Sequence, residues 1–188
     1  MRIAFVLFDR MTLLDFVGFY DVITRVKTMG FEEDLTWKCC ALKEEIRDDR
    51  GLVIKADVVG ESLDRYALVF IPRAVGTRVL QEDEIFIAWI KSAKFSKYKV
   101  SVCTGSLLLG AAGFLKEHHA TTHPGAYAEL EPYCEKVLRD RIVDEDEIIT
   151  AGGVTSAIDL GIYICHRLWG EDATLTIASV MDYPYIRI

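Results

Sequence analysis

The sequence predicts an α/β domain built on a mostly parallel sheet, and three observations support this. Short apolar runs of strand length alternate with longer segments of helical periodicity along the chain. The run at residues 3–8 is apolar at every position, which is typical of a strand buried on both faces. Hydrophobic residues make up 51% of the chain and charged residues 27%, which is typical of a compact globular protein.

The strands follow from apolar runs that end at a change of residue type, such as Pro72 or the pair His123-Pro124. They are expected at residues 3–8, 36–42, 67–71, 99–102 and 120–122. Two further segments are expected as hairpins because a turn-like sequence interrupts each of them. The first hairpin covers residues 47–59 around the turn at 48–51, and the second joins residues 141–143 to 148–150 across an acidic tip.

The helices follow from apolar residues that recur every three or four positions. In the first helix Leu13, Phe16 and Tyr20 recur near this spacing, and Gly30 follows its end. The helices are expected at residues 12–29, 83–93, 104–113, 154–169 and 172–181, with the last two separated at Gly170. We expect one domain over residues 1–188, because no repeat, low-complexity linker or clear boundary interrupts the pattern.

Charge and segment composition exclude several classes of protein. The net charge of −7 at pH 7 argues against nucleic-acid binding as the main task. No run approaches the roughly 18 apolar residues of a membrane span, and the apolar start of the chain reaches Asp9 and Arg10 too soon for a signal peptide. The sequence therefore predicts a cytoplasmic protein with neither a nucleic-acid nor a membrane partner.

The five cysteines are odd in number and irregularly spaced, so we expect no disulfide framework. No CxxC pair occurs, which leaves a structural zinc site without its usual ligands. His118, His119 and His123 lie close in sequence, but neighbouring histidines point in different directions and solvated loop histidines are common. We expect neither a metal nor a cofactor.

Cys103 stands where a strand ends and a helix begins at once. Such a turn is sterically crowded, and Ser101 and Gly105 supply the small residues that it needs two positions before and after the nucleophile. A helix starting at Thr104 would direct free N–H groups and its positive dipole end at the sulfur, which favours a reactive, accessible thiolate. The alternative is a buried structural cysteine at a strand end.

Four segments, at residues 12–22, 101–106, 120–124 and 150–159, resemble the ThiJ/PfpI superfamily, and they occur in that family's order. The resemblance implies a flavodoxin-like three-layer sandwich with helices on both faces of the sheet and a cysteine nucleophile elbow. The branch it resembles most is that of the isonitrile hydratases and the amidotransferase-like domains of AraC-type regulators. It also implies a homodimer.

The resemblance assigns roles to three residues. Cys103 is implied to be the nucleophile, Asp15 the acidic residue that faces it from the first helix, and Thr104 the residue that orients groups at the site. Asp15 and Thr104 are the types found in the isonitrile hydratases, whereas peptidase relatives carry a His after the cysteine. From the residues alone, Asp15 is also open to interpretation as a helix N-terminal cap following Thr12.

Further residues are implied to contact the substrate. Relatives have a Gly-Gly pair where this chain has Arg73 and Ala74, and a positive φ at either position would cost about 1 kcal/mol or more. Phe19 replaces a proline common in the first helix and would narrow the pocket. His123 matches a His that lies near the cysteine in many relatives, where it either activates the thiol or packs beside the site.

These observations predict a cysteine-dependent enzyme acting on a small electrophile, with hydration of isonitriles to N-substituted formamides as the leading hypothesis. Asp15 and Cys103 are expected to share one proton, held as a thiolate beside a protonated carboxyl. The alternative is a ligand- or redox-sensing module without catalysis, which the altered loop at Arg73 favours. A cysteine peptidase or amidase is disfavoured by Thr104.

Overall fold

The computed structural model describes residues 1–184, and its centre is a seven-stranded sheet. The strands of this sheet are β1 (Arg2–Val6), β2 (Thr36–Ala41), β5 (Val58–Val59), β6 (Leu68–Ile71), β7 (Tyr98–Val102), β10 (Ile142–Glu145) and β11 (Ile148–Ala151). Their spatial order is β10-β11-β7-β6-β1-β2-β5, and β10 is the strand that runs antiparallel to its neighbour. The predicted mostly parallel α/β sheet is confirmed.

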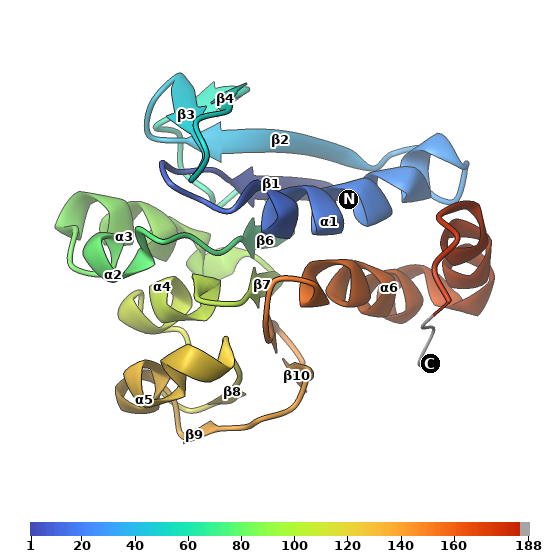
Figure 1. Cartoon of the computed structure of the whole chain (residues 1–188). Helices are drawn as coiled ribbons and strands as arrows, with labels where there is room; N and C mark the ends of the chain where they lie inside the picture. The colour runs from blue at the N-terminus through green and yellow to red at the C-terminus, as the bar shows by residue number, and fades with distance from the viewer. Residues whose placement is uncertain (185–188) are drawn as a thin grey trace.

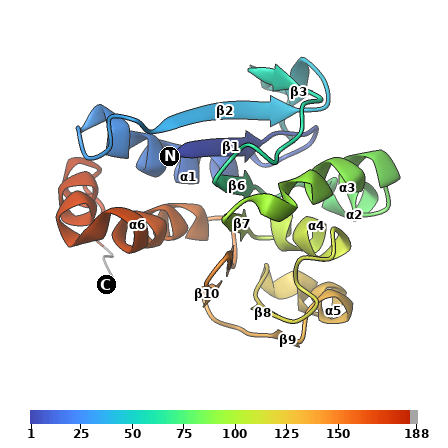
Figure 2. The same cartoon turned by 180° about the vertical axis from the view of Figure 1, so that it is seen from behind.

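The helices pack around this sheet (Figures 1 and 2). They are α1 (Leu13–Thr28), α2 (Thr77–Leu80), α3 (Glu84–Lys91), α4 (Gly105–Ala111), α5 (Tyr127–Leu130) and α6 (Ser156–Val180). Helices α1 and α6 lie side by side in both views and cross closely, because a Cβ on Gly161 would come within 2.8 Å of the Val22 Cβ. Gly170, with φ of 85°, interrupts α6 where the sequence predicts a break between two helices.

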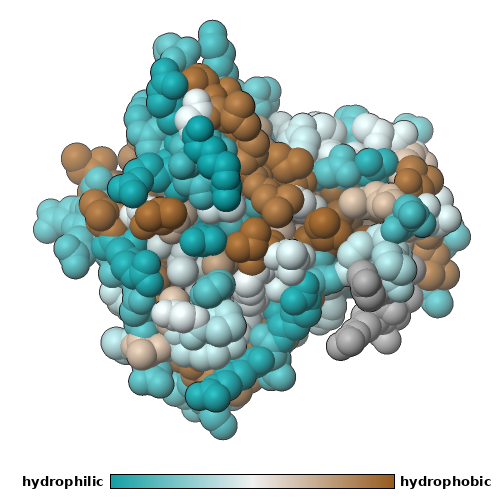
Figure 3. All heavy atoms as spheres, in the orientation of Figure 1, coloured by the Kyte–Doolittle hydropathy of each residue, from teal (hydrophilic) through white to brown (hydrophobic). Residues whose placement is uncertain are grey.

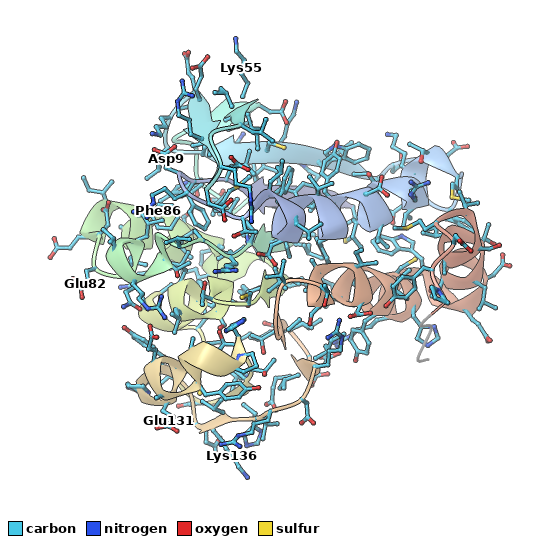
Figure 4. All side chains as sticks on the ribbon, in the orientation of Figure 1. Asp9, Lys55, Glu82, Phe86, Glu131 and Lys136 are labelled. Carbon is cyan, nitrogen blue, oxygen red and sulfur yellow. The ribbon has the colours of Figure 1, made fainter. Side chains whose placement is uncertain are left out.

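Two small sheets lie outside the central one. The antiparallel pair β3 (Glu45–Arg47) and β4 (Val53–Lys55) forms a hairpin around the predicted turn, and Lys55 points away from the body of the protein (Figure 4). The expected extent of this hairpin, to residue 59, is wrong, because residues 58–59 pair in parallel with β2 as β5 of the central sheet. Strands β8 (His119–Ala120) and β9 (Lys136–Val137) pair with each other in parallel.

The strand expected at residues 120–122 is wrong beyond its first residue. The Thr121 amide donates to the Thr150 hydroxyl at 2.9 Å, and the Thr121 hydroxyl donates to the Asp140 carbonyl at 3.0 Å. These bonds replace a strand ladder, so the segment leaves the sheet and turns toward the end of β7. Both Thr121 and Thr122 are fully buried.

Aromatic packing fixes α1 on the sheet. Phe19 of α1 stacks on Phe70 of β6 with ring centroids 4.1 Å apart, and Phe5 of β1 meets both rings edge to face. On α3, Phe86 packs edge to face on Phe8 at 5.4 Å, in the region labelled in Figure 4. No helix within residues 1–184 is long and apolar enough to cross a membrane.

Candidate active site around Cys103

Cys103 lies at the carboxyl edge of the sheet, between the end of β7 and the start of α4. Its amide donates to the Ala151 carbonyl at 2.8 Å, and its φ of 54° is a left-handed conformation that residues other than glycine seldom adopt. A Cβ on Gly105 would lie 2.4 Å from the Ile71 carbonyl oxygen, so this position accepts only glycine. The sharp strand-to-helix turn that the sequence predicts is therefore present.

The structure corrects the predicted accessibility of Cys103. Its side chain is fully buried, and burial, together with the negative charge of Asp15, raises the pKa of the thiol to about 12. The Thr104 backbone N–H and the charge of Arg73 lower this pKa, but less than burial raises it. Burial of the sulfur thus acts against the effect of the helix N-terminus, and the thiolate stays a prediction.

Asp15 lies in the first turn of α1 and is also fully buried. Neither carboxyl oxygen has a hydrogen-bond partner within the described chain. Burial raises the pKa of Asp15 to about 7, the charge of Arg73 lowers it, and the charge of Asp49 raises it further. Asp15 makes no capping hydrogen bond, so it is a buried, unpaired carboxyl that exchanges its proton near neutral pH.

Asp15 and Cys103 form one electrostatic unit. Each has a raised pKa, the charge of Asp15 contributes to that of Cys103, and Arg73 acts on both. Because burial raises both pKa values and the two negative charges repel each other, the pair favours holding a single proton at neutral pH. The predicted sharing of one proton agrees with this arrangement.

The Thr104 hydroxyl is engaged by the loop that follows β6. It lies 3.3 Å from the Ala74 carbonyl, to which it donates, and 3.1 Å from the Thr77 hydroxyl. The Thr77 hydroxyl lies 3.0 Å from the same carbonyl. The backbone N–H of Thr104 thus acts on the sulfur, and its side-chain hydroxyl hydrogen-bonds to the loop.

The loop at Arg73 and Ala74 is not strained. Neither residue has a positive φ, so the cost expected for replacing a Gly-Gly pair does not arise. The Arg73 carbonyl instead accepts the Thr12 amide at 2.8 Å, and Ala74 pairs with Met11 in an isolated antiparallel bridge. These contacts join the loop to the segment directly before α1, the helix that carries Asp15 in its first turn.

Phe19 and His123 are less closely tied to the sulfur. Phe19 is fully buried in the core against Phe70, and His123 is exposed, its Nδ1 accepting the Gly125 amide at 3.0 Å. No hydrogen bond links His123 to Cys103 within the described residues, but the neighbouring Thr122 hydroxyl donates to the Cys103 carbonyl at 2.9 Å. Substrate contacts by Phe19 and His123 stay predictions.

His118 and His119 both approach Glu145 of β10, at 3.7 and 2.8 Å. This carboxylate could not be expected beside them from the sequence, because it lies 26 residues from His119. Within residues 1–184 no group of three or more His, Cys, Asp and Glu side chains has the arrangement needed to hold a metal ion.

The model of the DJ-1/PfpI family matches residues 1–167 of this sequence. The chain belongs to the DJ-1/PfpI family. Its isonitrile hydratase relative from Pseudomonas putida is 33% identical, and the alignment covers 97% of this chain and 78% of that protein. The transcriptional regulator GbdR from Pseudomonas aeruginosa is 23% identical, and this chain spans about half of its length.

Solved structures of the family share the fold. A ThiJ/PfpI family protein from Pseudomonas syringae superposes with a TM-score of 0.89 at 26% identity, covering 99% of this chain and 76% of that one. DJ-1 of Schizosaccharomyces pombe superposes with a TM-score of 0.82 at 17% identity over 98% of this chain and all of that one. The mostly parallel sheet with helices around it is thus the DJ-1/PfpI arrangement, as the sequence motifs predict.

In this DJ-1/PfpI chain three neighbours of the site were not expected from the sequence. Asp49, within a predicted turn, accepts the Thr12 hydroxyl at 2.9 Å and adds negative charge near Asp15. Thr77 donates to the Thr104 hydroxyl, and Thr122 donates to the Cys103 carbonyl. The only signal was the run of two aspartates at 48–49, which is equally typical of a solvated turn.

Proposed function

We propose that this chain is a hydratase that adds water to isonitriles and releases N-substituted formamides, with Cys103 as nucleophile and Asp15 as its proton partner. The observation that carries the proposal is a buried carboxyl without hydrogen-bond partners beside a buried thiol on a strand-to-helix turn. The relationship to a Pseudomonas putida isonitrile hydratase, at 33% identity, supports the same reaction.

The terminal carbon of an isonitrile accepts both a nucleophile and a proton, and the pair supplies both. Ionised Asp15 takes the proton of the Cys103 thiol while sulfur forms a bond to that carbon. Asp15 then gives the proton to the same carbon, which leaves a thioimidate on sulfur. Water adds to the thioimidate carbon, the carbon–sulfur bond breaks, the nitrogen gains a proton and the thiol re-forms, so the net change is addition of one water.

The raised pKa of Asp15, about 7, suits this double task. A carboxyl with this pKa is ionised in a large fraction of molecules at neutral pH and is also a competent acid once it is protonated. The Thr104 backbone N–H stabilises negative charge on sulfur during attack, and the Thr104 hydroxyl holds the loop of Arg73 and Ala74 against the site. We assign that loop, with Phe19 and His123, to the substrate pocket.

The test is incubation of the purified protein with an aliphatic and an aromatic isonitrile, followed by detection of the formamide by mass spectrometry. We expect formamide to appear in proportion to enzyme concentration and time. A protein that consumes neither isonitrile, although it is folded by circular dichroism, would contradict the proposal.

A second candidate is a sensing module without turnover, and the complete burial of Cys103 favours it. The relationship to the regulator GbdR points the same way, although only about half of that protein is matched. In the isonitrile experiment a sensor would bind ligand, seen as a shift of the melting temperature, and would release no formamide. A cysteine peptidase or amidase lacks support, because Thr104 follows the cysteine and His123 makes no hydrogen bond to it.

We also propose that the protein forms a homodimer in the cytoplasm and takes a small molecule as its partner. Apolar side chains are exposed on α1 and on the turn before β4. Leu14 and Val17 are 51% and 40% exposed, and Leu52 and Val53 are 58% and 45% exposed. Figure 3 shows hydrophobic surface running from the hairpin toward α1. A second copy of the chain would cover such a surface.

A further inference from the structure

Arg73 is placed between the two elements that carry the reacting groups. It follows Pro72 at the carboxyl end of β6, and the Pro72 carbonyl lies 2.9 Å from the point where a Cβ of Gly105 would stand. On its other side, the Arg73 carbonyl accepts the amide of Thr12, directly before α1. The backbone of Arg73 therefore links the turn at Cys103 to the start of the helix that carries Asp15.

The loop that carries Arg73 is held in one position. The Ala74 carbonyl accepts hydrogen bonds from Thr77 at 3.0 Å and from Thr104 at 3.3 Å, and these two hydroxyls lie 3.1 Å apart. Thr77 is fully buried and Thr104 nearly so. Because both side chains are fixed at buried sites, Arg73 is presented to the site by a rigid loop.

The guanidinium of Arg73 has no ionic partner in the described chain. The side chain is half-buried, and within residues 1–184 no carboxylate lies within 4.0 Å of it and none accepts a hydrogen bond from it. Arg50 and Arg78, by contrast, are paired with acidic side chains. Arg73 is nevertheless close enough to the reacting pair for its charge to lower the pKa of both Asp15 and Cys103.

The backbone of the same loop also has open donors. The amides of Arg73 and Ala74 donate to no acceptor among the described residues, whereas the carbonyls of both residues accept hydrogen bonds. A planar guanidinium matches the geometry of a carboxylate, which accepts two parallel hydrogen bonds from arginine. An anion placed here would satisfy donors that the protein itself leaves open.

We propose that Arg73 binds a carboxylate of the substrate, so that the isonitriles turned over best are anionic ones in which a carboxylate stands close to the isonitrile carbon. The inference rests on the proposed hydratase function and adds a substrate class to it. The carboxylate would lie on Arg73, and the isonitrile carbon would extend toward Cys103. The family's usual Gly-Gly pair offers no side-chain charge at this place, so this selectivity belongs to the Arg73-Ala74 sequence.

The test compares isocyanoacetate with its ethyl ester, two isonitriles that differ mainly in charge. For the wild-type protein we expect kcat/KM for the carboxylate to exceed that for the ester. In Arg73→Gln the value for the carboxylate should fall roughly ten- to hundredfold further than the value for the ester, the size of a lost hydrogen bond to a charged group. Arg73→Lys keeps the charge without the planar guanidinium. Its preference for the carboxylate over the ester should lie between that of the wild type and that of Arg73→Gln.

Arg65→Gln is the matched control, because it removes the same charge from an exposed pair with Glu61 far from the site. It should leave the ratio of carboxylate to ester unchanged. Equal rates for carboxylate and ester in the wild-type protein, or equal losses for both in Arg73→Gln, would overturn the inference while leaving the hydratase proposal standing.

A binding measurement separates the inference from the proposed function. Calorimetry with N-formylglycinate and with its ethyl ester requires no turnover, and the wild-type protein should bind the carboxylate more tightly. Arg73→Gln should remove that preference. If no isonitrile is hydrated but the protein prefers the carboxylate in calorimetry, the hydratase proposal fails and the carboxylate site stands. If neither compound binds, or both bind equally tightly, the carboxylate site is refuted.

Discussion

Replacing Asp15 with asparagine should stabilise the folded protein at alkaline pH, because the carboxyl is buried without partners. On folding, its pKa rises from 3.8 to about 7. Between these values the folded protein keeps a proton that the unfolded chain has lost, so the free energy of unfolding falls as pH rises and levels off above about pH 7. The rise corresponds to about 4 kcal/mol lost at pH 8.

Asp15→Asn removes the ionisation and nearly preserves the shape of the side chain. Its amide remains buried without partners, which offsets about 1 kcal/mol of the gain. We therefore expect the free energy of unfolding of the variant to exceed that of the wild type by about 3 kcal/mol at pH 8. At pH 5 this difference should be smaller by about 3 kcal/mol. Urea unfolding followed by circular dichroism at both pH values measures the difference.

Asp64→Asn provides the control, since Asp64 is exposed and far from the site. Its free energy of unfolding should stay within about 0.5 kcal/mol of the wild type at both pH values. If Asp15→Asn is no more stable than the wild type at pH 8, or if its advantage is the same at pH 5, Asp15 is not the buried, unpaired carboxyl described above.

Three further predictions concern the turn, the thiol and the exposed apolar surface. Gly105→Ala should lower the free energy of unfolding by about 2–3 kcal/mol, because the new methyl group meets two backbone carbonyl oxygens. Gly153→Ala, where a Cβ meets only the His123 ring at 3.6 Å, should change this free energy far less. Equal losses for the two variants in urea unfolding would refute the crowded turn. Alkylation of Cys103 by iodoacetamide, followed by peptide mass spectrometry, should accelerate about tenfold per pH unit from pH 7 to 10, because the pKa of its thiol is raised to about 12. Asp15→Asn should increase the alkylation rate at a fixed pH, because it removes a negative charge that raises this pKa. A wild-type alkylation rate that reaches a plateau near pH 7 would instead indicate a stable thiolate. Leu14→Glu combined with Leu52→Glu should convert the dimer to a monomer by light scattering, with Phe95→Glu as a control at another exposed apolar residue; a wild-type monomer at micromolar concentration would contradict the dimer.

Much of the fold could be predicted from local pattern. The apolar run at residues 3–8 contains most of β1, β6 is apolar at every position, and the spacing of Leu13, Phe16 and Tyr20 indicates α1. The turn at Cys103 was also predictable, because crowding at such a corner restricts the residues two positions away. These features depend on neighbours in sequence, so the sequence contains their signal.

The parts of the site that could not be predicted depend on contacts between distant segments. The hydroxyls of Thr77 and Thr104 meet at one carbonyl although 27 residues separate them, and Asp49 reaches Thr12 across 37 residues. The accessibility of Cys103 was wrong for a related reason. A helix N-terminus is visible in the sequence, but the burial that outweighs it results from the packing of the whole sheet edge.

The central claim is that Cys103 and Asp15 together hydrate isonitriles, and the formamide production of Cys103→Ser tests it most directly. The variant replaces sulfur by oxygen at a position where the backbone is already fixed, so its fold should be unchanged by circular dichroism. If the account holds, the wild-type protein converts an isonitrile to its formamide and Cys103→Ser loses this activity by about a thousandfold or more. Formamide production by Cys103→Ser within about tenfold of the wild-type rate would contradict it.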